Sequence, residues 1–151
     1  MTDKAEIRFY HLERQSLEQV LPGLITKALE NGRRVMIRTA TEAQAETLSE
    51  HLWTHDPASF IPHGTLKDGH SARQPVVLTA APENVNSSTM LVLTHGVQAG
   101  DLEAFTLCCI MLDGRDPAAV ANARSQWTDY KSAGHAVTYW QQGEKGWQKK
   151  S

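Results

Sequence analysis

Two cations beside a large aromatic side chain are the residues of this sequence that most directly indicate a binding function. Arg124, Thr128 and Lys131 recur at i, i+4 and i+7, and Trp127 precedes Thr128. On a helix this spacing forms a stripe, where a guanidinium and an indole together can hold an acidic peptide or a terminal carboxylate. The alternative is the solvated flank of an ordinary amphipathic helix, which has the same pattern.

A cluster of potential metal ligands occurs in the polar segment 55–74. His63, Asp68 and His70 could ligate a metal ion or act as an acid–base pair. They have neither helical i, i+4 spacing nor a supporting cysteine, and polar loops collect such residues without a function. We therefore expect no metal site.

A group of apolar residues at the start of the same segment is the second candidate surface. Trp53, Phe60 and Pro62 are surrounded by polar residues. An apolar group inside a long loop is often a docking point for a partner. The alternative is a core tryptophan that a loop residue covers, and the sequence does not distinguish the two.

Signatures of nucleotide binding and of catalysis are missing from the sequence. Neither G-x-G-x-x-G nor G-x-x-x-x-G-K-[ST] occurs, and the turn expected at 12–16 carries the acidic Glu13. There is no G-x-S-x-G elbow, and no cysteine with the electropositive setting of a nucleophile. We expect no catalytic residue and no cofactor.

The bulk composition limits the class of protein further. The chain has 151 residues and a formal net charge of −2, which disfavours a domain whose main task is to bind nucleic acid phosphates. It has no apolar run of 18 residues and no signal-peptide pattern, so we expect a soluble, cytoplasmic protein without a membrane partner. The adjacent Cys108 and Cys109 lie in an apolar run and are expected to be buried thiols.

The elements that must position these residues alternate between short β-rich runs and helical patterns. This alternation predicts a single α/β domain over residues 1–151, in three Rossmann-like layers around a mainly parallel sheet. A long surface loop is expected at about 55–74, and a polar tail from about 143. The expected strands are 7–11, 34–38, 75–79, 90–94, 105–112 and 136–141, and the expected helices are 16–31, 41–53 and 117–133.

Helix ends and faces are the most specific of these expectations. Asp116 and Gly134 are typical of the start and end of the last helix, whose Val120, Ala123, Trp127 and Tyr130 should face the sheet. The first helix contains Pro22. Either that helix is kinked at the proline, or it begins there.

Several stretches together resemble the chi subunit family of DNA polymerase III. The resemblance spans almost the whole chain in the right order, and the loop segment 52–63 and the last-helix segment 123–135 are together the most specific. The matching stretches are 9–12 (FYHL), 32–37 (GRRVMI), 52–63 (LWTHDPASFIPH), 74–79 (QPVVLT), 123–135 (ARSQWTDYKSAGH) and 139–142 (YWQQ).

The resemblance implies a non-catalytic adaptor in DNA replication, which links the clamp loader to single-stranded DNA-binding protein and contacts DNA mainly indirectly. The acidic tail of that protein would lie on the last helix, with Arg124 as the carboxylate partner, Trp127 as an apolar wall and Lys131 as a second cation. Thr128 is neutral where a basic residue is expected. The psi subunit would contact the surface formed by Trp53, Phe60 and Pro62.

A small Rossmann-like enzyme or nucleotide-binding protein is the alternative function. Its site would lie at the carboxyl ends of the strands. A glycine-rich turn or converging titratable groups would favour this alternative, and the sequence has neither.

Overall fold

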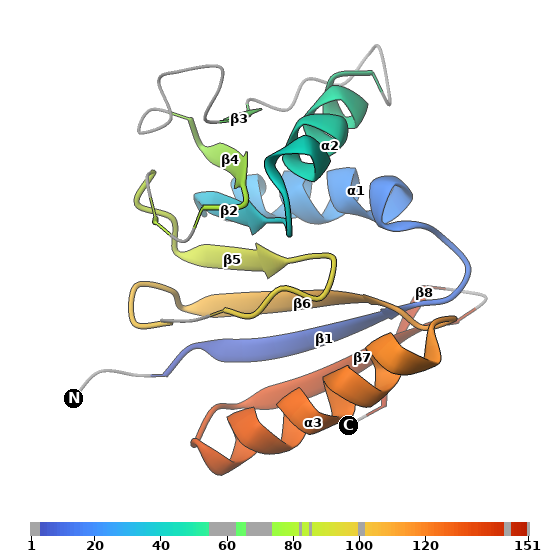
Figure 1. Cartoon of the computed structure of the whole chain (residues 1–151). Helices are drawn as coiled ribbons and strands as arrows, with labels where there is room; N and C mark the ends of the chain where they lie inside the picture. The colour runs from blue at the N-terminus through green and yellow to red at the C-terminus, as the bar shows by residue number, and fades with distance from the viewer. Residues whose placement is uncertain are drawn as a thin grey trace.

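The computed structural model describes residues 4–54, 63–65, 74–81, 83–84, 86–99, 102–143 and 146–150. Within these residues, three helices flank one eight-stranded sheet, so the predicted α/β fold with a mainly parallel sheet is confirmed (Figure 1). The elements are β1 (Glu6–Leu12), α1 (Leu17–Glu30), β2 (Val35–Arg38), α2 (Glu42–Thr54), β3 (Gly64–Thr65), β4 (Val76–Thr79), β5 (Met90–Leu93), β6 (Leu107–Asp113), α3 (Pro117–Ser132), β7 (Val137–Gly143) and β8 (Gly146–Lys149).

The strands are arranged in the order β3-β4-β2-β5-β6-β1-β7-β8. Every neighbouring pair is parallel except β7 and β8, which run antiparallel. The chain leaves β1 through α1 toward β2, and leaves the neighbouring β6 through α3 toward β7. Figure 1 shows α3 beside β7 and β1 at one end of the sheet, and α1 and α2 nearer to β2 and β4.

The helices cover opposite faces of the sheet, because side chains alternate along each strand. Val35 and Ile37 of β2 pack with the buried side chains of α1 and α2, whereas Met36 packs in a second core with Ala123 of α3. The central strand β6 is buried on both faces, as its apolar run predicts. Its Cys109 is a buried free thiol, and burial raises the pKa of that thiol to about 12.

Local capping signals explain where the helices begin and end. Ser16 and Gln19 form a capping box at the start of α1, so this helix begins before Pro22 and contains it. The side chain of Asp116 accepts a hydrogen bond from the backbone of Ala118 at the start of α3. Gly134 follows α3 with a φ of 95°, a conformation that glycine adopts without steric cost.

Two segments differ from their sequence-based descriptions. Within the expected 55–74 loop, residues 63–65 are buried, and Gly64–Thr65 pairs with β4 as β3. Residues from Gly146 to Lys149 do not form a polar tail but pair with β7 as β8. Trp147 explains the second difference, because its ring packs edge-on against Tyr10 at 5.1 Å and ties the strand to the core.

Candidate functional site

The inward face of α3 holds the helix on the sheet through aromatic contacts. Ala123 is 2% exposed, and Val120, Trp127 and Tyr130 are partly buried against the same core, as the helical spacing predicts. The Trp127 ring lies 6.0 Å from that of Phe9, measured between centroids. The indole is therefore fixed by packing and presents its remaining surface beside the outer stripe.

The outer stripe of α3 is exposed along its length. Arg124, Thr128 and Lys131 all face solvent. The Lys131 ammonium lies 5.7 Å from the centroid of the Trp127 ring, in a cation–π contact. The Thr128 hydroxyl donates to the carbonyl oxygen of Arg124 at 3.3 Å. Across the described part of the chain, the guanidinium of Arg124 forms no ion pair, so its N–H groups are available to donate to an external carboxylate.

A concave surface lies between this stripe and strands β1 and β7. It has a volume of about 470 Å³ and is called the α3 groove below. Lys131 is not among its lining residues, although the ammonium lies over the adjoining indole. The groove is lined by His11, Val120, Arg124, Trp127, Thr128, Tyr139 and Gln141.

A hydrogen-bonded chain of polar groups forms the β-strand side of the α3 groove. His11 Nδ1 and the Tyr139 hydroxyl are 2.6 Å apart, and His11 Nε2 lies 2.9 Å from Glu13 Oε1. The same Glu13 oxygen accepts from Gln141 Nε2 at 2.7 Å. Burial raises the pKa of Tyr139, although the nearby Arg124 acts in the opposite direction, so the phenol stays protonated near neutral pH.

Strand register brings these groups together, and sequence reasoning did not assign them to the site. β1 and β7 are parallel neighbours in which Phe9 is opposite Tyr139 and His11 is opposite Gln141. The Phe9 and Tyr139 rings are stacked, with centroids 6.0 Å apart. The available signal was the alternation of apolar residues in 7–11, which places His11 on the same sheet face as Phe9.

Charges are distributed unevenly along the α3 groove. Arg124 lies on the helix side, and Glu13 lies beyond His11 at the strand side. An acidic ligand is therefore attracted to the helix side and repelled at the other.

The second predicted surface is only partly within the described residues. Trp53 lies near the end of α2 and is 48% exposed, the one large apolar side chain with such exposure in the described ranges. Its ring packs against that of His63, with centroids 4.2 Å apart. Phe60 and Pro62, the other two residues of this surface, lie outside the described residues.

His63 itself is part of the packed structure. It is 2% exposed, and its Nε2 lies 3.0 Å from the carbonyl oxygen of Ser49 in α2. Burial under Trp53 leaves this imidazole little access to a metal ion from solvent. Asp68 and His70, the other two candidate ligands, lie outside the described residues. The described part of the chain contains no group of three side chains that could hold a metal ion.

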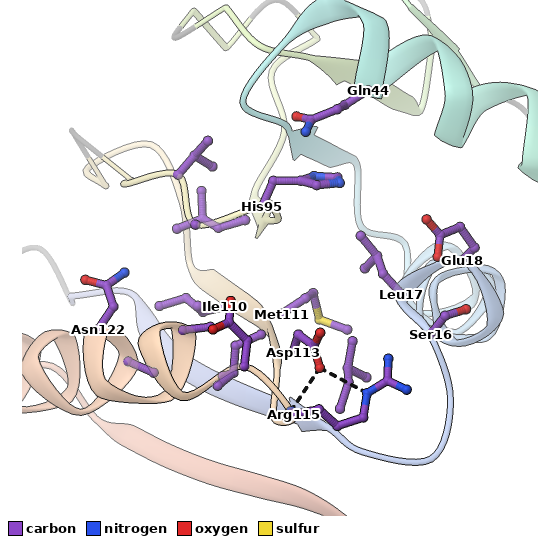
Figure 2. A pocket seen from close by; sticks show the side chains of 18 of the residues that line it. Ser16, Leu17, Glu18, Gln44, His95, Ile110, Met111, Asp113, Arg115 and Asn122 are labelled. Atoms are coloured by element: carbon purple, nitrogen blue, oxygen red, sulfur yellow. Dashed lines mark hydrogen bonds and ion pairs between the residues drawn. The ribbon is translucent and has the colours of Figure 1, made fainter.

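A larger crevice of about 590 Å³ lies at the carboxyl ends of β1, β5 and β6, where ligands bind in many doubly wound folds (Figure 2). Its lining includes the carboxylates of Glu18, Asp113 and Asp116. The backbone N–H of Arg115 donates to Asp113 at 2.9 Å and holds the pKa of that carboxyl below its usual value. Arg115 also lines the crevice, but its guanidinium is paired with Asp113 at 3.3 Å, so the carboxylates of Glu18 and Asp116 remain uncompensated by it and disfavour a phosphate here.

At each helix N-terminus beside this crevice, a side chain of the same chain caps one backbone N–H. The Ser16 side chain accepts from the backbone of Gln19, and Asp116 accepts from that of Ala118. A phosphate would have to displace these caps to reach the amides. The geometry therefore does not favour the alternative of a nucleotide-binding protein.

Comparisons with known proteins agree with the resemblance in the sequence. The family described as DNA polymerase III chi subunit, HolC, matches residues 4–138. The chain is 31% identical over 88 residues to a probable DNA polymerase III subunit chi of Rickettsia prowazekii. These 88 residues cover 58% of this chain and 53% of that protein. It is 32% identical over 78 residues to DNA polymerase III subunit chi of Escherichia coli, or 52% of each chain.

A third relative is the DNA polymerase III subunit chi of Haemophilus influenzae, which is 28% identical over 64 residues, 42% of this chain and 44% of that protein. The matched regions thus span about half the length of these relatives. None of the described helices is both long enough and apolar enough to cross a membrane.

Proposed function

The chain belongs to the DNA polymerase III chi subunit family, and we propose that it acts as a non-catalytic adaptor of the replicase. In this role it binds the acidic C-terminal tail of single-stranded DNA-binding protein and links it to the clamp loader, in the cytoplasm. Its contact with DNA is mainly indirect. The observation that carries the proposal is the α3 groove, where Arg124 and a fixed indole lie on one exposed surface.

Each part of the α3 groove matches one part of an acidic tail. The guanidinium of Arg124 can bind a carboxylate through two parallel N–H donors. An apolar side chain of the tail can pack against Trp127 and Val120. The Lys131 ammonium, held over the indole, adds a second positive charge at the edge. Thr128 contributes no charge, so we expect weak binding, with a Kd on the order of micromolar.

The second partner in this proposal is the psi subunit. Of its three proposed contact residues, Trp53 is the one that lies among the described residues. Half of this indole is exposed while the other half packs on His63. Apolar side chains held in this way are typical of interface anchors. Phe60 and Pro62 complete the proposed surface.

Isothermal titration of the tail peptide tests the proposal. Arg124→Ala should weaken binding by roughly 30-fold, about 2 kcal/mol, because a charge-assisted pair is lost. This is the lower end of the range for such pairs, since Arg124 is exposed and its charge is screened. Lys131→Ala should cost less and mainly change the salt dependence.

Arg115→Ala is the matched control, because Arg115 is an exposed arginine that does not line the α3 groove. It makes the same change in net charge. Equal affinities for the parent, Arg124→Ala and Arg115→Ala would place the tail elsewhere. A peptide with an amidated C-terminus separates the contribution of the terminal carboxylate from that of acidic side chains.

A further inference from the structure

A concave surface on the other face of the sheet has a different chemical character. It has a volume of about 500 Å³ and lies between α1 and the sheet, and it is called the α1 pocket below. Tyr10 and Met111 in its lining belong to the core under α1, whereas Phe9 belongs to the core under α3. The α1 pocket and the α3 groove therefore lie on opposite faces, and one ligand does not block the other.

The charges that line the α1 pocket are all positive. Arg8, Lys27 and Arg33 line it, and none of the fifteen described residues in its lining is acidic. The chain as a whole has 17 acidic and 15 basic residues, so this surface departs from the average composition. Such a local excess attracts anions even though the net charge of the protein is −2.

The three cations differ in their existing partners. Arg8 is paired with Glu6, which neutralises much of its charge. Arg33 Nη1 donates to the neutral Thr106 hydroxyl at 3.2 Å, so its charge is not compensated there. Lys27 is exposed in the last turn of α1 and forms no ion pair with any described residue. Lys27 and Arg33 are therefore the principal anion partners at this site.

The interior of the α1 pocket is apolar and aromatic. Met90, Leu107 and Met111 line it together with Tyr10 and Trp147. The Trp147 ring packs edge-on against Tyr10, at an interplanar angle of 77°, and is only partly buried. A flat ring can therefore enter beside Trp147 without unfolding the core.

Side-chain amides complete the lining of the α1 pocket. Gln15, Gln19 and Asn31 provide donors and acceptors beside the apolar interior. The Gln19 oxygen accepts from the Ser16 backbone at 2.8 Å, which leaves its amide nitrogen directed to other partners. Amides of this kind can form hydrogen bonds with the edges of nucleobases.

We propose that the α1 pocket binds single-stranded DNA, with one base beside Trp147 and adjacent phosphates on Lys27 and Arg33. A nucleic acid strand has three features that this pocket can bind: a flat base, the polar edge of that base and an anionic phosphate. The indole, the side-chain amides and the two cations of the α1 pocket are the respective partners. An acidic peptide would match the cations but not the flat, amide-lined interior. The contact is local and weak, in agreement with an adaptor that contacts DNA mainly through another protein.

Fluorescence anisotropy with a labelled oligo(dT) of roughly 20 nucleotides tests this inference. We expect a Kd of about 10–100 μM at low salt, and a slope of log affinity against log salt of about −1.4, because the two phosphates on Lys27 and Arg33 are neutralised. Lys27→Ala combined with Arg33→Ala should weaken binding about tenfold and reduce the slope by about 1.4. Trp147→Leu should weaken binding by about fivefold or more and abolish the quenching of indole emission by the bound base.

The matched control is again Arg115→Ala, which removes one exposed positive charge outside the α1 pocket. An equal loss of affinity in this variant would mean general electrostatic attraction and would overturn the proposal. Circular dichroism checks that Trp147→Leu is folded. If Trp147→Leu does not fold, the double variant of Lys27 and Arg33 still tests the site, because Lys27 is exposed and its replacement should not disturb the core.

Competition against the labelled strand distinguishes single-stranded DNA from two other ligands, a mononucleotide and an acidic peptide. Saturable displacement by thymidine monophosphate at micromolar concentration would indicate a small-molecule site and contradict the proposal. Displacement by an acidic peptide, lost in the Lys27 and Arg33 double variant, would indicate peptide docking and also contradict it. The inference is independent of the α3 groove, because Arg124→Ala should weaken the tail peptide and leave oligo(dT) binding unchanged.

Discussion

Replacing Gly114 by alanine should disturb the strand side of the α3 groove through a single methyl group. Gly114 lies in the turn after β6, directly against the His11 ring. A Cβ atom at this position would be 2.9 Å from His11 Cε1 and would overlap Cδ2 and Nε2. The backbone of Gly114 is not in the left-handed region, so the cost comes from the ring alone.

The size of the effect follows from what holds the ring. His11 is hydrogen-bonded to Tyr139 and to Glu13, and both contacts are lost or lengthened if the ring moves. At about 1 kcal/mol for each bond, and a further contribution from disturbed packing, we expect a loss of about 2–3 kcal/mol. For a domain of this length, that lowers Tm by roughly 5–10 °C. The affinity for the tail peptide should fall as well, because His11 and Tyr139 line the α3 groove.

Thermal unfolding of four variants measures the effect: Gly114→Ala, Gly23→Ala, His11→Ala and the double variant of Gly114→Ala with His11→Ala. Gly23→Ala is the matched control, because a Cβ at this helical position meets no atom within 4 Å, and the change should stabilise the protein by about 0.5–1 kcal/mol. Gly114→Ala in a His11→Ala background should cost much less than in the parent, since the overlapping ring is gone. The reasoning is refuted if the cost of Gly114→Ala is the same in both backgrounds.

Three further predictions concern groups outside the α3 groove. Cys109 should react with an aromatic disulfide reagent at pH 8 only when the protein is unfolded in denaturant, because burial raises the pKa of its thiol to about 12. Burial raises the pKa of both Tyr10 and Tyr130 to about 12, so the unfolded chain loses these protons first and the urea midpoint should fall as pH rises from 10 toward 12. Trp53→Ala should lower the free energy of unfolding by about 1 kcal/mol or less, because half of this side chain is exposed, whereas Leu52→Ala at the buried neighbouring position should lower it by about 2–5 kcal/mol. Denaturant titrations of the two variants measure both values.

Local signals allowed the helical side of the candidate site to be predicted from the sequence. The cap at Asp116 and the spacing of Trp127 with Arg124 depend on residues within a few turns of one another. The capping box at Ser16 sets the start of α1 and resolved the position of Pro22. Thr41 and Gln44 form a second capping box at the start of α2, in which each side chain accepts from the backbone N–H of the other residue.

Long-range pairing formed the rest of the site, and a single sequence does not specify it. His11 and Tyr139 are 128 positions apart and meet because β1 and β7 are neighbours in the sheet. Strand β8 was missed for a similar reason: its one large apolar residue, Trp147, is flanked by polar residues, and its partner Tyr10 lies near the other end of the chain. Alternation at an exposed edge gives too weak a signal to separate a strand from a tail.

The antiparallel return of β8 changes how the sheet is exposed to other chains. Without it, the seven-residue β7 would present a free backbone edge, which is the usual template for unwanted pairing between proteins. With it, the described sheet ends in four residues that include Lys149 at one side, and in the two-residue β3 at the other. Short, charged edges resist aggregation in a crowded cell. They also leave recognition to the side chains on the two faces, so that a partner must match chemical groups and cannot simply add a strand.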